Sequence, residues 1–468
     1  MRRGQDLLTK QFIHIISGLG MLLISLFVII DMILGANSSV DTLYYLFLIG
    51  VLLIYVFLLS KPSYRFGFHF IIITYTILCQ FGYLFANKWN SNAAQIRSVA
   101  SLAYQYMPEY VLALEISWLF IAILAFSVRF NNFRYIFKGE SSRCVNNLME
   151  DKNALEPEAD GAFEKASFIV GMILLIIGLV LLLFTYIITR GMPYSERSPY
   201  LKSTYDWYGH VIVILSYAYI VILANCNKSK WKTALIPYAA VIIVHLLMGN
   251  RGEVLYTLIT CLAVYNMKYK KVNLKLIIIG GTALVMLIPL VRDFRQELSL
   301  ATYTSSLTSN LVETFSEIGF QIAPFTYTIQ IVNLGTPYRL GATYIYGIVD
   351  FIFRKIPFVG ALPTESINNI KYMMPKKGMG FSTVAESFYN FGIIGGGIFI
   401  FIIGILIFKL EMIYTKSGES KYKKTFAALF VVEMMNLTRN SSGTLMLYIT
   451  YILLILLSIK LVTKFRTR

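Results

Sequence analysis

Charged residues are scarce in this sequence. They make up 14% of its 468 residues, against about 25% in an ordinary soluble domain. Hydrophobic residues make up 57%, and the mean hydropathy is +0.64. A single hydrophobic core stops growing at about 250–300 residues, and uninterrupted apolar runs such as Leu174–Phe184 are typical of segments surrounded by lipid. The composition therefore excludes one soluble globular domain and predicts an integral membrane protein.

Cysteine and histidine are also rare, with four of each. The cysteines lie within or beside apolar runs and show no paired spacing, which argues against a disulfide framework or a zinc site. No His, Asp and Glu set has metal-ligand spacing, so we expect no metal ion and no cofactor. A net charge of +17 would suggest nucleic acid as a partner of a soluble chain. In a membrane protein the placement of that charge matters more, and we expect no nucleic-acid partner.

Apolar stretches long enough to cross a membrane predict an all-α, polytopic protein with about twelve transmembrane helices. We expect three parts: a nine-span membrane bundle at 1–291, a large extracytoplasmic loop at 292–390, and three more spans at 391–468. The bundle contains a polar, acid-rich loop at 131–165, which we interpret as a flexible linker. The predicted spans lie near 12–34, 42–59, 66–86, 110–128, 167–188, 209–225, 233–248, 254–267, 275–291, 391–409, 425–437 and 443–460.

The distribution of lysine and arginine predicts the orientation. With the N-terminus inside, 27 of the 42 Lys and Arg residues fall in cytoplasmic segments, as the positive-inside rule requires. The 292–390 segment does not count in this comparison, because long segments are translocated regardless of charge. We therefore expect both termini to be cytoplasmic.

The 292–390 segment is far longer than a connection between two spans needs to be, so it is the candidate functional element. Within it, Thr343, Gly347, Asp350 and Arg354 recur at helical spacing and leave an apolar surface on the remaining faces. Such a helix is expected to lie in the membrane interface. The alternative is a helix that packs on the other spans without touching lipid.

Arginine marks three outer junctions. Arg251 stands in the Asn250-Arg251-Gly252-Glu253 turn, Arg292 and Arg295 follow the span that ends near 291, and Arg439 occupies a short outer turn. The planar guanidinium group provides fixed, permanently charged donors that suit phosphate oxygens. The alternative for each arginine is contact with lipid headgroups or pairing with an acid such as Glu253.

The segment that leads into the 391–409 span carries Ser382, Glu386 and Asn390 at i, i+4 and i+8, so a helix places all three on one face. A partly desolvated carboxylate at the membrane boundary is a candidate general base. The alternative for Glu386 is an arginine partner or a helix-entry residue. His245 lies near the outer face and is a further candidate, with a hydrogen-bonded intramembrane histidine as its alternative.

These features together resemble the Wzy-type polymerases of bacterial O-antigens and capsules. The resemblance rests on the number of spans, on the single large outer loop before the last three spans, and on two local motifs. The motifs are Ser-x-x-x-Glu-x-x-x-Asn-x-Gly-x-x-Gly from Ser382 and the turn at Asn250-Arg251-Gly252-Glu253. O-antigen ligases usually carry a histidine near the end of the large loop, and this chain has none between 292 and 390. That difference disfavours a ligase and leaves Glu386 as the nearest ionisable substitute.

The resemblance implies a C-type glycosyltransferase in the bacterial cytoplasmic (inner) membrane. It would join oligosaccharide repeat units carried on undecaprenyl diphosphate, without a nucleotide sugar or a metal ion, and it would work among membrane lipids beside a flippase and a chain-length regulator. Glu386 would act as the base, and Arg251, Arg292 and Arg439 would stabilise the departing diphosphate. The main alternative is a lipid-linked oligosaccharide flippase, for which short loops and charged residues deep in the spans are expected. The remaining candidate substrate contacts are Asn250, Glu253, Arg295, Ser382, Asn390 and His245.

Overall fold

The structure is a computed structural model, and it describes residues 2–60, 66–91, 106–137, 159–192, 194–205, 207–248, 251–273, 275, 280, 307–353 and 380–466. Within these residues every regular element is a helix. Nine of the described helices are long and apolar enough to cross a membrane. The prediction of an all-α, multi-pass membrane protein is therefore confirmed.

Nine of the twelve predicted spans match helices of spanning length. Two others correspond to shorter described helices, since 254–267 lies in α12 and 425–437 lies in α19. The predicted span at 275–291 falls almost wholly outside the described residues, so the total of twelve stays a prediction. The nine candidate spans are Gln11–Ile33, Val40–Leu59, Phe68–Trp89, Met107–Val128, Gly161–Ile188, Trp207–Asn225, Lys228–Met248, Thr383–Thr415 and Ser442–Arg466.

The chain forms two compact units, and each draws on more than one segment of the sequence. The three-part division predicted from the sequence is a different grouping and stays a prediction. Unit 1 comprises Met1–Lys138, Leu311–Lys409 and Met434–Met446, and unit 2 comprises Gly139–Asn310, Leu410–Glu433 and Leu447–Arg468. The helices of unit 1 are α1 (Arg2–Ile33), α2 (Val40–Leu59), α3 (Phe68–Trp89), α5 (Met107–Phe137), most of α14 (Leu307–Ile318), η4 (Gly319–Gln321), α15 (Ile322–Asn333), α16 (Ala342–Phe353), most of α18 (Thr383–Thr415) and η6 (Ser442–Thr444). The helices of unit 2 are α7 (Ala159–Ile188), α8 (Tyr194–Thr204), α9 (Trp207–Asn225), α10 (Lys228–Thr233), α11 (Leu235–Met248), α12 (Arg251–Lys268), most of α19 (Lys421–Leu437) and most of α20 (Leu445–Arg466).

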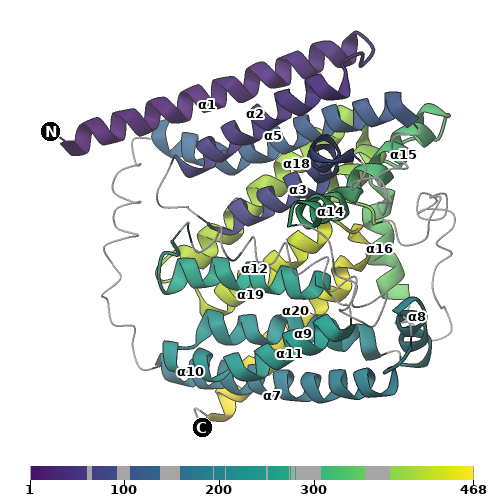
Figure 1. Cartoon of the computed structure of the whole chain (residues 1–468). Helices are drawn as coiled ribbons and strands as arrows, with labels where there is room; N and C mark the ends of the chain where they lie inside the picture. The colour runs from purple at the N-terminus through teal and green to yellow at the C-terminus, as the bar shows by residue number, and fades with distance from the viewer. Residues whose placement is uncertain are drawn as a thin grey trace. The chain divides into compact units, whose positions relative to one another are not determined.

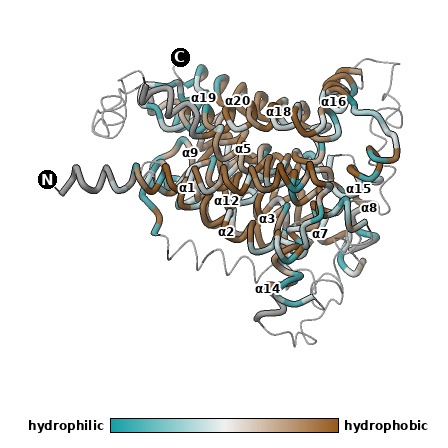
Figure 2. The backbone as a smooth tube through the Cα atoms, turned by 90° about the horizontal axis from the view of Figure 1, so that it is seen from above, coloured by the Kyte–Doolittle hydropathy of each residue, from teal (hydrophilic) through white to brown (hydrophobic). Residues whose placement is uncertain are grey.

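The core of unit 1 is aromatic. Phe47 of α2 stacks on Phe81 of α3 and on Trp118 of α5, with ring centroids 5.0 and 5.5 Å apart. Gly50 leaves the space that the Trp118 ring fills, because a Cβ at this position would lie 2.3 Å from the indole. Hydrophobic residues follow α1, α2 and α3 over most of their length (Figure 2). Packing of large rings thus fixes the bundle against which part of the 292–390 segment packs.

Part of the 292–390 segment packs directly on this bundle. The η4 turn lies against α3. Helix α15 lies against α5 (Figure 1). The approach at η4 is backbone to backbone: a Cβ on Gly319 would lie 2.0 Å from the Tyr83 nitrogen. Pro324 stands in the first turn of α15, where a missing N–H costs no hydrogen bond. The segment from α14 to α15 is therefore a packed part of unit 1 and not a free loop.

Helix α18 is broken at Gly392, which has φ 66° and ψ −161°. This conformation is easily reached only by glycine. The break separates a short helix at 383–391 from the long apolar helix that follows it. As a result, Glu386 and Asn390 lie on a separate helical segment that precedes the break.

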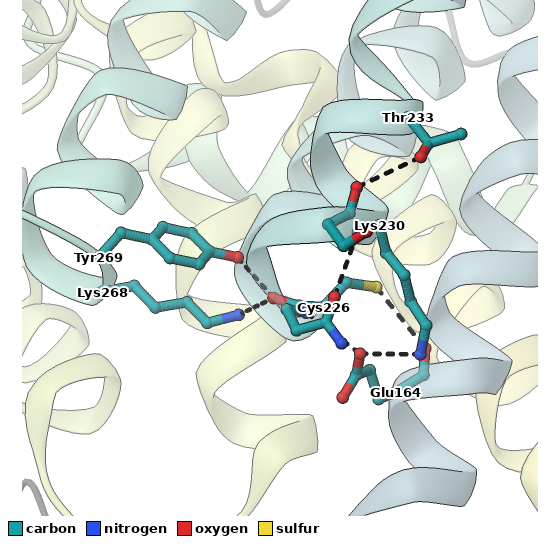
Figure 3. A network of polar contacts seen from close by, with 8 residues as sticks. Glu164, Cys226, Lys230, Thr233, Lys268 and Tyr269 are labelled. Carbon is teal, nitrogen blue, oxygen red and sulfur yellow. Dashed lines mark hydrogen bonds and ion pairs between the residues drawn. The ribbon is translucent and has the colours of Figure 1, made fainter.

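In unit 2, α9 packs against α7 and α12, and α11 packs against α7. The C-terminal end of α9 is fixed by a polar network (Figure 3). Lys268 Nζ donates to the carbonyls of Leu223 and Cys226, at 3.3 and 2.7 Å, and the Tyr269 hydroxyl donates to the same two carbonyls. A cation at the C-terminal end of a helix is stabilising, so this network has a structural explanation.

Candidate functional site

The carboxylate of Glu386 is the centre of a buried hydrogen-bond network in unit 1. Its Oε1 accepts from the hydroxyls of Thr343 and Ser442, each at 2.8 Å. Its Oε2 accepts from the backbone N–H of Ser442 at 2.9 Å. Glu386 is only 1% exposed. One carboxylate therefore ties the start of α16 and the η6 turn to the short helix at 383–391.

Asn390, one turn further along the short helix, fastens that helix to the start of α16. Its Oδ1 accepts from the backbone N–H of Gly341 at 3.0 Å. Its Nδ2 donates to Thr343 Oγ1 at 2.7 Å and to the Glu386 carbonyl at 2.8 Å. Both ends of the amide are engaged, as is usual for a buried polar group. The i, i+4 alignment of Glu386 and Asn390 expected from the sequence is therefore present, and Thr343 joins the two side chains.

The turn that precedes α16 is held against the break in α18. The backbone N–H groups of Arg339 and Leu340 donate to the carbonyls of Tyr389 and Asn390, at 3.1 and 2.8 Å. Leu340 adopts φ 48°, a left-handed conformation that is uncommon for leucine. Strained backbone of this kind persists where surrounding contacts over-determine it, and it is frequent at functional sites.

Ser382 is the residue before the first turn of α18, and its hydroxyl caps the helix. Ser382 Oγ accepts from the Ala385 N–H and from Gln80 Nε2, both at 3.2 Å. Gln80 Oε1 in turn accepts from the Ser117 hydroxyl at 3.2 Å. Helix caps of this type stabilise by about 1 kcal/mol. The predicted role of Ser382 in substrate binding stays a prediction beside this structural one.

Arg439 lies in the turn between α19 and η6, three residues before Ser442. Its guanidinium lies over the ring of Phe320, 4.8 Å from the ring centroid, and it is partly exposed. The same turn is fixed to the start of α18, because the Thr383 hydroxyl donates to the Leu437 carbonyl at 2.6 Å. Hydrogen bonds therefore join the turn that carries Arg439 both to the start of α18 and to the Glu386 carboxylate.

All the donors that contact the Glu386 carboxylate are neutral. In the part of the chain that the structure describes, no arginine or lysine pairs with it. The arginine-partner alternative is therefore unsupported within these residues. A buried carboxylate that is compensated only by neutral hydrogen bonds is costly, so this glutamate needs an explanation beyond packing.

Arg339 is a basic residue of this site that sequence reasoning missed. Its Nε donates to the Tyr389 hydroxyl at 2.8 Å, and its guanidinium lies 5.6 Å from the centroid of that ring. Arg339 is partly exposed. It has no acidic partner among the described residues. Thr343 was noted only as part of a helix face, and Ser442 only as part of the Arg439 turn.

The predicted interfacial helix is present as α16, Ala342–Phe353. Thr343 and Gly347 are buried, whereas Ile345, Ile348 and Ile352 are 59%, 41% and 50% exposed. Two residues of the predicted polar face therefore pack inward, while Asp350 is partly exposed, Arg354 lies outside the described residues and an isoleucine face is exposed. Exposed isoleucines suit contact with lipid, which stays a prediction.

The other predicted site residues lie in unit 2 or outside the described residues. His245 on α11 is 3% exposed, and its Nδ1 has no hydrogen-bond partner among the described residues. Arg251 begins α12, where its side chain and that of Glu253 are not described. Asn250, Arg292 and Arg295 lie outside the described residues. Their predicted roles stay predictions.

Arg197 on α8 is a further arginine that the sequence analysis passed over. It is 6% exposed, and it donates to the carbonyls of Leu247 and Met192 at 3.2 and 3.1 Å. The first of these carbonyls is at the C-terminal end of α11, where a cation is favoured. Arg197 therefore holds the end of the helix that precedes the Asn250-Arg251 turn.

Comparison with protein-family models matches residues 15–468 to the family described as O-antigen polysaccharide polymerase Wzy. This chain belongs to that family. It is also similar to Protein CapE of Staphylococcus aureus, with 26% identity over 343 residues that cover 73% of each chain. No solved structure matches the chain.

Membership of the Wzy family confirms the resemblance seen in the sequence. It supports a membrane enzyme of the polysaccharide-polymerase kind and favours this reading over a flippase or a ligase. The family match covers both units, so the buried Glu386 network and the α11–α12 junction both lie within the matched region.

Proposed function

We propose that this Wzy-family protein joins oligosaccharide repeat units carried on undecaprenyl diphosphate into an O-antigen or capsular polysaccharide at the outer face of the bacterial cytoplasmic membrane. The observation that carries the proposal is the Glu386 network. It links a turn bearing Arg339 to a turn bearing Arg439 within one compact unit. A carboxylate can accept the proton of an attacking hydroxyl, and guanidinium groups can stabilise the charge of a departing diphosphate.

In the proposed reaction, a hydroxyl of the incoming repeat unit attacks the anomeric carbon of the growing glycan. The new C–O bond forms as the bond from that carbon to the diphosphate oxygen breaks. The hydroxyl proton passes to Glu386, and the lipid diphosphate leaves with its negative charge stabilised by Arg339 and Arg439. Arg251 and Arg292 stay candidates for the same task. The negative charge is met by guanidinium groups, so we propose a reaction that needs no metal ion.

The enclosure of Glu386 suggests how a proton would reach it. The Thr343 and Ser442 hydroxyls both donate to its Oε1. A hydroxyl can accept a proton from the substrate while it donates its own, so either residue can relay the proton to the carboxylate. Hydrogen bonds of a catalytic group often rearrange when substrate binds. We therefore propose Glu386 as the final acceptor of the proton, with direct contact to the sugar not required.

The function is tested with purified protein in lipid vesicles and a lipid-linked repeat unit extracted from the source strain after deletion of this gene. A polymerase converts this single substrate into a ladder of lipid-linked products without added nucleotide sugar. The deletion strain should carry surface glycan of one repeat unit. Accumulation of lipid-linked units on the cytoplasmic side would instead support a flippase and contradict the proposal.

The proposed orientation predicts the labelling of two exposed positions. Asn37 lies in the turn after α1, and Ser417 lies in the turn between α18 and α19. In a cysteine-free background, Asn37→Cys should react with a membrane-impermeant maleimide in cells whose cytoplasmic membrane is intact and whose outer membrane surface is accessible to the reagent. Ser417→Cys should react only after the cytoplasmic membrane is permeabilised. The reverse pattern would place the termini outside.

A further inference from the structure

Gln321 is a fully buried residue whose side-chain amide makes no hydrogen bond. It is 0% exposed, and neither its Nε2 nor its Oε1 has a partner among the described residues. An amide removed from water without a compensating hydrogen bond costs free energy, and buried polar groups are almost always paired. A buried amide whose donor and acceptor are both unpaired therefore indicates that a group other than the described residues, such as a ligand, pairs with it.

Two other buried amides of unit 1, those of Gln80 and Asn390, provide the contrast. Gln80 uses both ends of its amide, on Ser382 and Ser117. Asn390 also uses both ends of its amide. All three residues are 0% exposed and belong to the same unit. A buried amide in unit 1 can thus have both ends hydrogen-bonded, and the Gln321 amide differs from those of Gln80 and Asn390 in that respect.

The unpaired amide lies beside Arg439 and just below a partly exposed surface. A Cβ on Gly380 would lie 2.2 Å from the Arg439 carbonyl oxygen and 2.6 Å from Gln321 Nε2. Gly380 and Arg439 are both partly exposed. The residue before Gln321 is Phe320, on whose ring the Arg439 guanidinium rests. The backbone of the turn that carries this guanidinium therefore lies next to the Gln321 amide, and a ligand bound at the turn would be close to that amide.

We propose that Gln321 is a substrate-specificity residue that binds an uncharged polar group, a hydroxyl or an acetamido group, on the sugar next to the diphosphate of the lipid-linked saccharide. The inference rests on the proposed function, because it takes Arg439 as a diphosphate contact. A neutral amide offers donors and an acceptor together, which matches sugar hydroxyl and acetamido groups. It does not match a phosphate, which only accepts.

The test replaces Gln321 by methionine, which keeps the length of the side chain and removes its hydrogen-bonding groups. Gln330→Met is the matched control, since Gln330 is a partly buried glutamine on the following helix, α15. Thermal unfolding is measured in detergent with three samples: protein alone, protein with undecaprenyl diphosphate, and protein with the lipid-linked repeat unit from the deletion strain. Affinities come from the dependence of the transition temperature on ligand concentration.

For Gln321→Met we expect an unchanged or higher transition temperature without ligand, because the replacement removes an unpaired buried amide. We expect an affinity for the lipid-linked repeat unit that is about tenfold lower or more, as the loss of a pair of neutral hydrogen bonds implies, and an unchanged affinity for undecaprenyl diphosphate. Gln330→Met should match the parent with both lipids.

Other outcomes overturn the inference separately from the proposed function. A lower transition temperature of Gln321→Met without ligand, with both affinities retained, would mean that the amide binds only water. An equal loss of affinity for both lipids would mean that the Gln321 amide does not bind the sugar. Failure of the parent protein to bind either lipid would contradict the proposed function itself.

Discussion

Replacement of Glu386 by glutamine is expected to leave a folded, membrane-inserted protein that forms little or no polymer. Glutamine keeps the shape of the side chain but cannot take up the proton of the attacking hydroxyl. A general base contributes about 10²–10⁴ in rate, so the specific activity should fall by at least a hundredfold. The measurement is polymer formed per molecule of protein in the membrane, with the lipid-linked repeat unit as substrate.

The structure adds a competing explanation that this experiment has to exclude. Glu386 accepts three hydrogen bonds that tie α16 and η6 to α18, so its loss could act through folding. Thr343→Val is the matched control, since it removes one of these hydrogen bonds, together with the one that Asn390 donates to Thr343, and leaves the carboxylate in place. If Glu386 were only an anchor, both variants would lower protein abundance and activity in parallel.

If Glu386 is the general base, the same two variants should behave differently from each other. Glu386→Gln would lose activity at near-normal abundance, and Thr343→Val would keep most of its activity because Ser442 still contacts the carboxylate. Activity of Glu386→Gln within about threefold of the parent would contradict the proposed base, and His245 would be the next residue to test.

The i, i+4 spacing in the sequence was sufficient to predict that Glu386 and Asn390 share one helical face, whereas Ser382 lies just before the helix and caps it. A helix fixes which residues share a face, and that rule needs no tertiary information. The all-α membrane fold followed in the same way from apolar runs of spanning length. The break at Gly392 was not predicted from the sequence.

The partners of Glu386 depend on contacts between distant segments, so local patterns could not reveal them. Thr343 and Ser442 are 43 and 56 residues away from it. The Arg339 turn takes its place through backbone hydrogen bonds to Tyr389 and Asn390, and those carbonyls lie just before the break in α18. One usable signal was in the sequence: Arg339 lies four residues before Thr343, at the entry to the helix that was predicted.

Replacement of Arg439 by lysine is expected to lower polymer formation by about 10²–10³, the usual cost of removing one preorganised donor to a developing charge. Lysine keeps the positive charge and can still lie over the Phe320 ring, so the fold should be retained. It cannot present two parallel N–H donors to a diphosphate. The same change at Arg251 should have an effect of similar size if that arginine shares the ligand.

Arg466→Lys is the control for Arg439→Lys, since Arg466 lies in the last turn of α20, at the end of the chain that we expect to be cytoplasmic. Initial rates of polymer formation per molecule of inserted protein are compared at several concentrations of the lipid-linked repeat unit. A forked contact that tightens as the diphosphate leaves predicts a fall in kcat that exceeds any rise in KM, because only interactions stronger in the transition state accelerate the reaction. If Arg439 only anchors the protein to lipid headgroups, Arg439→Lys should give normal polymer length and rate. That result would mean that the departing diphosphate is stabilised by Arg339, or by Arg251 and Arg292.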